Sequence, residues 1–172
     1  DFVVQGPIEL AKEIYARLDK YLIADDVELI DESEDETAYL IVTNETRRII
    51  DGVPRWPNEL FAGILPPEAG VERKSISYTK GCYTGQEVIS RMKRAGKTNR
   101  HLVKLALDKP LIPTKAKLLV EGQEAGFITS VASHIGKGEV ALGYRYRKYS
   151  EAEKFDVASP SSGTIIGKAF LR

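Results

Sequence analysis

The octapeptide Lys80-Gly81-Cys82-Tyr83-Thr84-Gly85-Gln86-Glu87 contains the only cysteine of this 172-residue chain. Thr84 and Glu87 are three residues apart and stand directly before an apolar pair, which is the pattern of a capping box at a helix N-terminus. The sequence therefore predicts a helix from Gly85 to about Lys93, with Thr84 as its N-cap.

This pattern places Cys82 two residues before the helix, close to the positive end of the helix dipole. Lys80 lies two residues from Cys82, and both effects favour the thiolate, which is the nucleophilic and metal-binding form of cysteine. The flanking glycines, Gly81 and Gly85, permit backbone conformations that a side chain would block. The loop therefore indicates a chemical role for Cys82, although a lone cysteine is also common as a small buried hydrophobic residue.

No base or metal partner for Cys82 is evident in the sequence. The two histidines, His101 and His134, are far from it along the chain and make no Cys/His metal-ligand spacing. One cysteine does not hold an iron–sulfur cluster alone, because such clusters usually take four thiolates. A catalytic pair with Cys82 would therefore need a contact that only folding creates.

The composition is that of an ordinary globular protein, with 42% hydrophobic and 29% charged residues. Lysine plus arginine equals aspartate plus glutamate at 25 each, so no net charge indicates a nucleic-acid or membrane partner. A single cysteine makes no internal disulfide, which favours a reducing compartment, and we expect the cytoplasm. No apolar run approaches the roughly 20 residues of a membrane span, and no secretory leader is visible. Because the chain opens on Asp1, we expect a longer translation product.

The N-terminal part predicts one helix and two strands. Apolar residues recur at helical spacing over residues 5–22, with Pro7 in the first turn. Residues 25–36 carry eight acids and no base, and we interpret the run Asp31 to Glu36 as an exposed turn. Strands are predicted on either side of it, at Val27–Ile30 and, more clearly, at Thr37–Thr43.

The middle part predicts the end of a short helix and an ordered loop. Gly52 has the position of a C-terminal helix cap, with Pro54 just beyond it, but the helix has almost no body. Residues 53–72 hold four prolines and indicate a surface loop, in which Trp56 is expected to be a packing anchor. A short extended segment is predicted from Arg73 to Tyr78, leading into the cysteine loop.

After Gly96 the sequence becomes rich in strand patterns separated by glycine turns, which is typical of a small barrel or sandwich. A domain boundary is therefore expected near residues 96–101. The predicted strands are Leu102–Leu107, Ala116–Val120, Gly126–Ala132, Glu139–Tyr146, Phe155–Ala158 and Thr164–Leu171.

The octapeptide resembles the K-G-C-[YF]-x-G-Q-E motif of the YgfZ family, folate-binding proteins related to the aminomethyltransferase (T protein) of the glycine cleavage system. The resemblance covers most of residues 47–146. Its other elements are Gly52-Val53-Pro54-Arg55-Trp56, the segment Leu65 to Glu72, Ile76 to Thr79, Arg91-Met92-Lys93 with Gly96, Gly126 to Ser130, and Ala141 to Tyr144.

The resemblance implies an α+β fold, with a ferredoxin-like folate-binding domain of the aminomethyltransferase type followed by a small C-terminal β-barrel. Residues 1–98 would be a remnant of the folate-binding domain that lacks N-terminal and internal segments, and residues 99–172 would be the barrel. Cys82 would be the functional residue, beside tetrahydrofolate or a derivative. The residues that would contact the cofactor are Lys80, Gly81, Tyr83, Gly85, Gln86, Glu87, Arg91 and Asp51.

The function implied by the resemblance is assembly or repair of iron–sulfur clusters, notably in radical enzymes that thiolate tRNA. Expected partners are iron–sulfur enzymes or cluster carriers and a small-molecule folate, with no membrane and no direct nucleic-acid contact. Relatives often have a glutamate where this chain has Ile50, and Ile50 does not accept a hydrogen bond from a pterin ring. Asp51, the next residue, would point elsewhere on a helix.

Two alternative functions stay open. One is a tetrahydrofolate-dependent aminomethyltransferase, for which a thiol is not needed. The other is a non-enzymatic RNA- or protein-binding module that uses the basic run from Arg91 to Lys104, which contains no acid. Such a run is more often a solvated face, and aromatic residues for base stacking are scarce in it.

Overall fold

The computed structural model describes residues 4, 6–21, 29–31, 44–136 and 138–172. The chain divides into two compact units, Asp1–Val42 and Thr43–Arg172, which are described here one at a time. The strand predicted at 37–43 and the start of the one at 27–30 lie outside the described residues, and residues 29–31 form no strand. The expected division into domains 1–98 and 99–172 stays a prediction. Contacts group residues 44–98 with the barrel, but such a grouping does not test where one folding domain ends and the next begins.

The described residues of the first unit contain one helical segment, as the apolar periodicity predicts. A 3₁₀ turn, η1 (Ile8–Leu10), leads into α1 (Ala11–Tyr21). Pro7 stands at the start of the segment, where its fixed φ of −58° suits a helix entry. The helix predicted over residues 5–22 is therefore confirmed from residue 8 to residue 21, and residues 5 and 22 lie outside the described residues.

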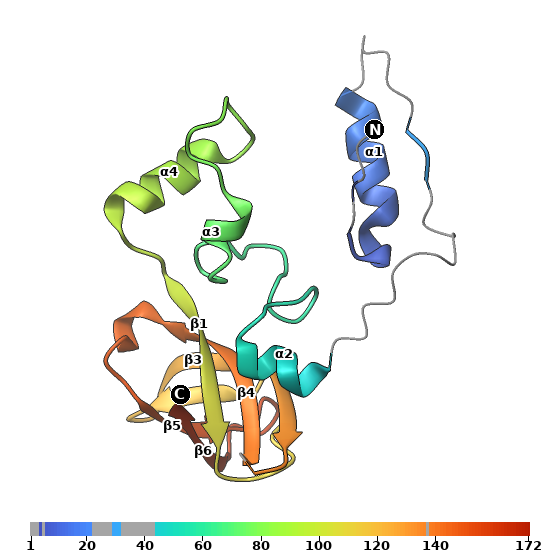
Figure 1. Ribbon diagram of the computed structural model, residues 1–172. Coiled ribbons are helices and arrows are strands. Elements are labelled where there is room, and N and C mark those ends of the chain that lie inside the picture. The colour runs from blue at the N-terminus through green and yellow to red at the C-terminus, as the bar shows by residue number, and fades with distance from the viewer. Residues whose placement is uncertain (1–3, 5, 22–28, 32–43, 137) are drawn as a thin grey trace. The chain divides into compact units, whose positions relative to one another are not determined.

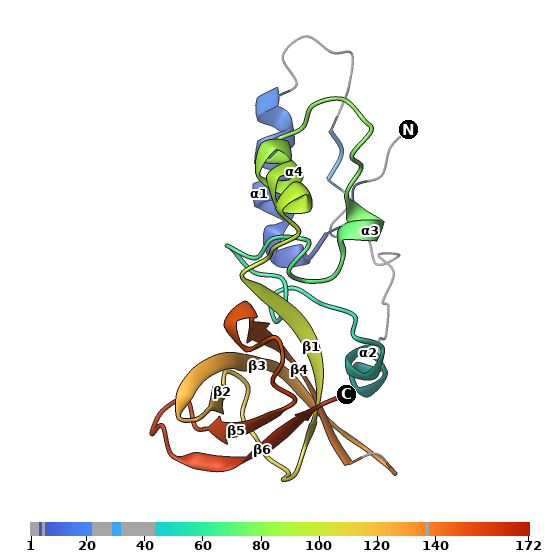
Figure 2. The same ribbon diagram turned by 90° about the vertical axis from the view of Figure 1, so that its left-hand side faces the viewer.

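The second unit is built on a closed antiparallel barrel (Figures 1 and 2), in which the strand order is β1-β4-β3-β2-β5-β6. Every described strand of the chain belongs to this barrel. The strands are β1 (Arg100–Leu107), β2 (Lys117–Val120), β3 (Gln123–His134), β4 (Gly138–Tyr146), β5 (Lys154–Ala158) and β6 (Ile165–Leu171), with a 3₁₀ turn η2 (Arg147–Tyr149) after β4. The barrel predicted from the alternating strand patterns is confirmed, and each predicted strand is present with small shifts at its ends.

The barrel interior is filled by the alternate apolar residues of its strands, as period-two side-chain alternation requires. Leu105, Leu118, Ile128 and Val157 are fully buried there. Gly126 marks a close approach between β3 and β4, because a Cβ at this position would lie 2.0 Å from the Tyr144 carbonyl oxygen. The core thus needs glycine at this crossing as much as it needs the aliphatic residues.

The helix α2 (Glu45–Asp51) covers the outer face of the barrel at β3 and β4. Asn44 caps it by accepting from the Arg47 amide at 3.1 Å. Gly52 ends it in the left-handed conformation, with φ 75°, so the predicted cap is confirmed. Ile49 is 1% exposed and forms a small second core with Val140 and Leu142. The helix therefore packs against the outer wall of the barrel.

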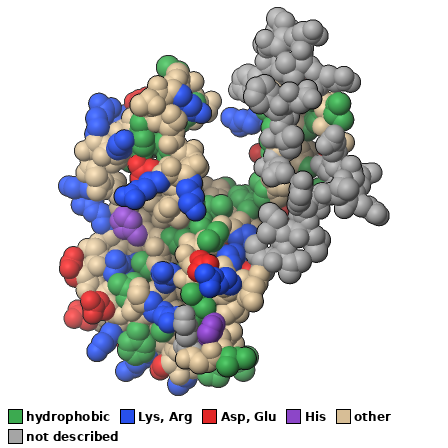
Figure 3. Space-filling model, viewed as in Figure 1, with side chains coloured by type: hydrophobic (Ala, Val, Ile, Leu, Met, Phe, Trp, Pro, Cys, Tyr) green, Lys and Arg blue, Asp and Glu red, His purple; other side chains and the backbone are tan. Residues whose placement is uncertain are grey.

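Between α2 and β1 the chain forms a long loop and two further helices, α3 (Glu72–Ser75) and α4 (Gln86–Ala95). The extended segment predicted from Arg73 to Tyr78 is wrong in its first half, because Ser75 and Lys74 donate their amides to the Val71 carbonyl and close a helical turn. Trp56 is partly buried in the loop. In Figure 3, Lys and Arg side chains gather around the α4 end of the visible face.

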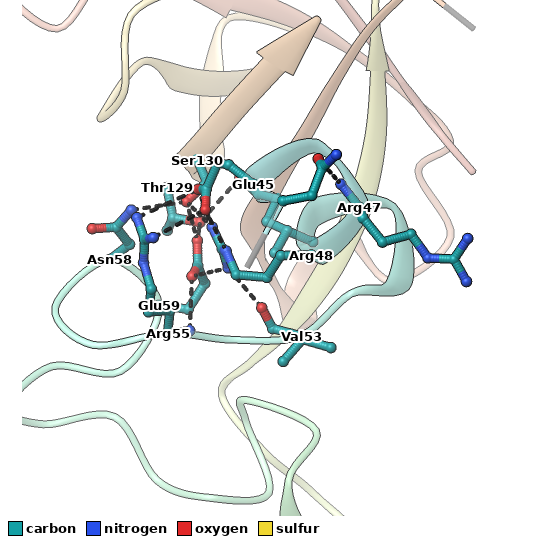
Figure 4. A network of polar contacts seen from close by, with 11 residues as sticks. Glu45, Arg47, Arg48, Val53, Arg55, Asn58, Glu59, Thr129 and Ser130 are labelled. Carbon is teal, nitrogen blue, oxygen red and sulfur yellow. Dashed lines mark hydrogen bonds and ion pairs between the residues drawn. The ribbon is translucent and has the colours of Figure 1, made fainter. Parts of the chain in front are cut away.

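A buried charge pair joins the loop, α2 and β3 (Figure 4). Arg48 of α2 donates to the Glu59 carboxylate at 2.8 Å, and the two side chains are 3% and 0% exposed. All five N–H groups of Arg48 are used, because it also donates to both carboxylate oxygens of Glu45, to the Val53 carbonyl and to the Ser130 hydroxyl. A buried guanidinium is tolerated when its donors are satisfied in this way.

Glu59 is satisfied just as fully. Its carboxylate accepts from Thr129 and Ser130 at 2.6 Å each and from the Arg55 amide at 3.1 Å, in addition to Arg48. Its backbone carbonyl accepts from the Tyr144 hydroxyl at 2.9 Å. The proline-rich loop is thus fastened to two barrel strands through one residue.

We predict that Glu59→Ala lowers the free energy of unfolding by about 3–5 kcal/mol, because it leaves the buried Arg48 charge without its partner. Urea unfolding of the whole chain measures this change. Glu87→Ala is the matched control, since it breaks an ion pair whose side chains are 73% and 80% exposed. That control should cost less than about 1 kcal/mol. Equal losses in the two variants would contradict the prediction.

Candidate functional site around Cys82

Cys82 lies exposed in the loop that precedes α4. In Figures 1 and 2, this loop and α4 lie beyond the start of β1, clear of the barrel. No residue of α4 is buried. The reading of Cys82 as a small buried hydrophobic residue is therefore wrong, and the thiol is open to a reagent or partner.

The start of α4 differs from the predicted capping box. Gly85, with φ 86°, is the N-cap, and no side chain makes a capping hydrogen bond. The prediction of Thr84 as N-cap is therefore wrong. The helix begins one residue later, so Glu87 falls at its second position and accepts instead from Arg91 at 2.6 Å, one turn along. Gly85 is needed here because the left-handed conformation is strained for other residues.

Two tyrosines stand on the inner side of the cysteine loop, and a lysine lies over each ring. The Lys80 ammonium is 5.0 Å from the centre of the Tyr83 ring, and the Lys93 ammonium is 3.5 Å from the centre of the Tyr78 ring. The Tyr83 hydroxyl is buried and has no hydrogen-bond partner among the described residues. The contact between Lys93 and Tyr78 joins α4 to the loop, whereas the contact between Lys80 and Tyr83 lies within the loop.

The Tyr78 hydroxyl donates to the Glu72 carboxylate of α3. This hydrogen bond, together with the negative charge of Glu72, raises the pKa of Tyr78 to about 12. Glu72, Tyr78 and Lys93 therefore connect α3, the cysteine loop and α4. The sequence carries no signal for this cluster, since none of the three residues belongs to a motif that pairs them.

Most of the predicted site residues lie on one short segment because they are neighbours in the sequence. Cys82 and its neighbours lie in the loop, and Arg91 lies one turn into α4. The residues on this segment are Lys80, Gly81, Cys82, Tyr83, Gly85, Gln86, Glu87 and Arg91.

Asp51 is not among them. It is the last residue of α2, against the barrel, and its carboxylate accepts from Arg47 at 2.7 Å. Ile50, beside it, packs against the small core formed by Ile49, Val140 and Leu142. At the end of α2, Ile50 offers a pterin no side-chain acceptor, and one oxygen of the exposed Asp51 carboxylate is engaged by Arg47.

The basic run from Arg91 to Lys104 begins within α4, and its side chains are partly exposed to solvent and partly engaged in structural contacts. Arg94 and Lys97 are exposed, as expected for a solvated face. Arg100 instead donates to the buried Glu68 carboxylate at 3.2 Å and to the Gly63 carbonyl at 3.1 Å. His101 contacts the Thr98 hydroxyl and not the cysteine loop.

Among the described residues, no group of three or more His, Cys, Asp or Glu is arranged to hold a metal ion. Over the same part of the chain, no helix is long and apolar enough to cross a membrane.

The chain is similar to several known proteins. No family model matches it. It is 37% identical over 101 residues to a putative chloroplastic transferase of Arabidopsis thaliana, covering 58% of this chain. It is 30% identical over 118 residues to the mitochondrial iron–sulfur cluster assembly factor IBA57 of Mus musculus, covering 62%. It is 33% identical over 116 residues to the aminomethyltransferase of Exiguobacterium sibiricum, covering 66%.

Its homologues are aminomethyltransferase-like proteins. The chain spans 23%, 33% and 31% of the length of these three relatives, respectively. The YgfZ family within this group is not distinguished by the matches.

The fold is that of part of an aminomethyltransferase. The crystal structure of the glycine cleavage system aminomethyltransferase T from Bartonella henselae superposes with a TM-score of 0.59 at 19% identity. The superposition covers 73% of this chain and 36% of that one. The closed barrel and its covering helices agree with the expected fold, whereas the ferredoxin-like domain is not confirmed.

We predict that Glu72→Gln moves the pKa of Tyr78 from about 12 toward its usual value near 10, because the charged acceptor is lost. The ring carbon signal of Tyr78, assigned with Tyr78→Phe, reports the titration by NMR. Glu87→Gln is the control, because Glu87 pairs with Arg91 and not with Tyr78. The linkage has a definite sign: a raised tyrosine pKa stabilises the fold below pH 10, and this contribution is lost as the pH rises toward 12. An unmoved titration in Glu72→Gln would refute the assignment.

Proposed function

We propose that this chain acts as an accessory protein in iron–sulfur cluster assembly or repair, with Cys82 as its functional residue. The observation that carries the proposal is the exposed thiol on a loop that projects from the barrel. The relationship to the mouse iron–sulfur cluster assembly factor supports it. An exposed thiol suits a transient contact with a cluster carried by another protein.

The finer parts of the proposal rest on the resemblance of residues 80–87 to the YgfZ motif. The client enzymes would then include radical enzymes that thiolate tRNA, and the partners would be iron–sulfur enzymes or cluster carriers. A reducing compartment fits the single cysteine, and we propose the cytoplasm, although two relatives are named for the chloroplast and the mitochondrion.

Tetrahydrofolate binding is the part of the proposal that the site residues support least. The aminomethyltransferase relative supports a folate ligand for the group. In this chain, however, Ile50 packs against the barrel and Asp51 is paired with Arg47. The folate contacts of this chain would therefore come mainly from the loop residues Lys80 to Arg91, without the acceptor that relatives often carry at the position of Ile50.

We predict that Cys82→Ala and Cys82→Ser abolish complementation of a bacterial strain that lacks its iron–sulfur accessory factor. The reason is that the reacting thiol is removed while the exposed position leaves the fold intact. Thiolated nucleosides in total tRNA, measured by mass spectrometry, give the readout. Thr84→Ala is the matched control, because Thr84 is an exposed neighbour that caps no helix. Full complementation by Cys82→Ala would sink the role assigned to Cys82.

We also predict that the chain binds tetrahydrofolate weakly and that Ile50→Glu tightens binding by about tenfold or more, the effect of one added hydrogen bond to a polar ligand group. Isothermal titration calorimetry measures both affinities. Asp51→Asn should leave the affinity unchanged, because Asp51 is one position further along the helix and points elsewhere than residue 50. Tight binding by the unaltered chain would show that Ile50 is not the limiting residue.

A folate-dependent aminomethyltransferase is the second candidate. The relative named aminomethyltransferase favours it, and the solved aminomethyltransferase T structure shares its fold with this chain. The two candidates differ in their need for the thiol. Measurable aminomethyl transfer to tetrahydrofolate that survives Cys82→Ala would favour the transferase. Transfer that is absent while complementation depends on Cys82 would favour the accessory protein.

A further inference from the structure

The helix α4 carries an apolar stripe of Val88, Met92 and Ala95, of which Met92 is half-buried. Val88, Met92 and Ala95 recur at i, i+4 and i+7, so their side chains lie on one side of the helix. Val88 is 49% exposed, and Ala95 is also exposed. Exposed apolar positions at this spacing are the anchors by which a helix enters a groove of another protein.

The surroundings of this stripe are strongly basic, although the whole chain has no net charge. Residues 72–97 hold seven Lys and Arg residues against two acids. Both acids already have partners: Glu72 accepts from Tyr78, and Glu87 accepts from Arg91. The basic residues are Arg73, Lys74, Lys80, Arg91, Lys93, Arg94 and Lys97. Figure 3 shows Lys and Arg side chains around this end of the molecule.

We infer that α4 is a docking helix for an acidic protein, which receives the stripe of Val88, Met92 and Ala95 in an apolar groove edged by carboxylates. The inference deepens the proposed function, since such docking brings the partner next to Cys82. The apolar contact supplies specificity and affinity, and the charge surplus raises the rate of association.

The same surface fits the other classes of partner less well. Single-stranded nucleic acid would need open aromatic faces, but Lys80 and Lys93 lie over the two nearby rings, Tyr83 and Tyr78. A membrane surface would need a larger apolar face with aromatic or leucine side chains, and α4 contains none of these. Two copies of the same basic surface would repel each other.

A designed acidic helical hairpin, with a leucine-lined groove edged by glutamates, tests the inference as a fluorescent probe for anisotropy titration against the whole chain. We expect binding that weakens as salt rises. The double variant Val88→Gln/Met92→Gln, which keeps good helix formers, should weaken binding about tenfold or more, as expected for anchor residues. Arg94→Glu/Lys97→Glu should weaken it similarly. Leu111→Gln is the control with equal binding, because Leu111 is 95% exposed on the barrel.

Several outcomes would overturn the inference. One is that a hairpin with lysines in place of the glutamates binds with the same affinity. Another is that Leu111→Gln weakens binding as much as Val88→Gln/Met92→Gln does. A third is that the chain binds uridine-rich RNA or anionic phospholipid vesicles more tightly than it binds the acidic hairpin. Self-association that vanishes in Val88→Gln/Met92→Gln would identify a second copy as the occupant instead. Cys82→Ala should bind the hairpin normally, so that failure of docking and failure of the thiol function are distinguishable.

Discussion

The buried pair of Arg48 and Glu59 is the interaction on which the second unit depends. A seven-residue helix such as α2 does not persist on its own, because nucleation outweighs the few hydrogen bonds it gains. Ile49 packs α2 against the barrel through apolar contacts. Arg48 and Glu59 connect α2 to the loop and to β3. Every donor of Arg48 has an acceptor, so the cost of burying the charge is offset only while all partners stay in place.

A second connection explains how the cysteine loop is carried. Glu68 ends the proline-rich loop, Arg100 begins β1, and the two side chains pair at 3.2 Å. The Leu102 amide also donates to the Glu68 carbonyl at 2.9 Å. The residues between Glu68 and Arg100, including α3, the cysteine loop and α4, therefore leave the barrel and return to it at one point. The two ends of this segment are held at the barrel, whereas Cys82 is exposed and α4 has no buried residue.

The sequence was sufficient for elements that depend on local pattern. The barrel strands follow alternation, and the α2 terminus follows from Gly52 and the proline beyond it. The prediction of Thr84 as the N-cap is wrong because Gly85 occupies that position. The local sequence pattern is compatible with two helix starts that are one residue apart. Contacts such as Arg48 with Ser130, which are 82 residues apart, carry no local signal, because only folding brings them together.

The same geometry bears on why fold alone does not decide function here. The relatives include a named aminomethyltransferase and a named iron–sulfur cluster assembly factor, so one framework is associated with both. The barrel and α2 constitute that framework, and their buried contacts constrain substitution. The segment from Glu72 to Lys97 buries none of its residues, so its side chains vary at little cost in stability. The difference between a transferase and an accessory protein is therefore to be sought there, in an exposed thiol, a glycine-started helix and a surplus of positive charge.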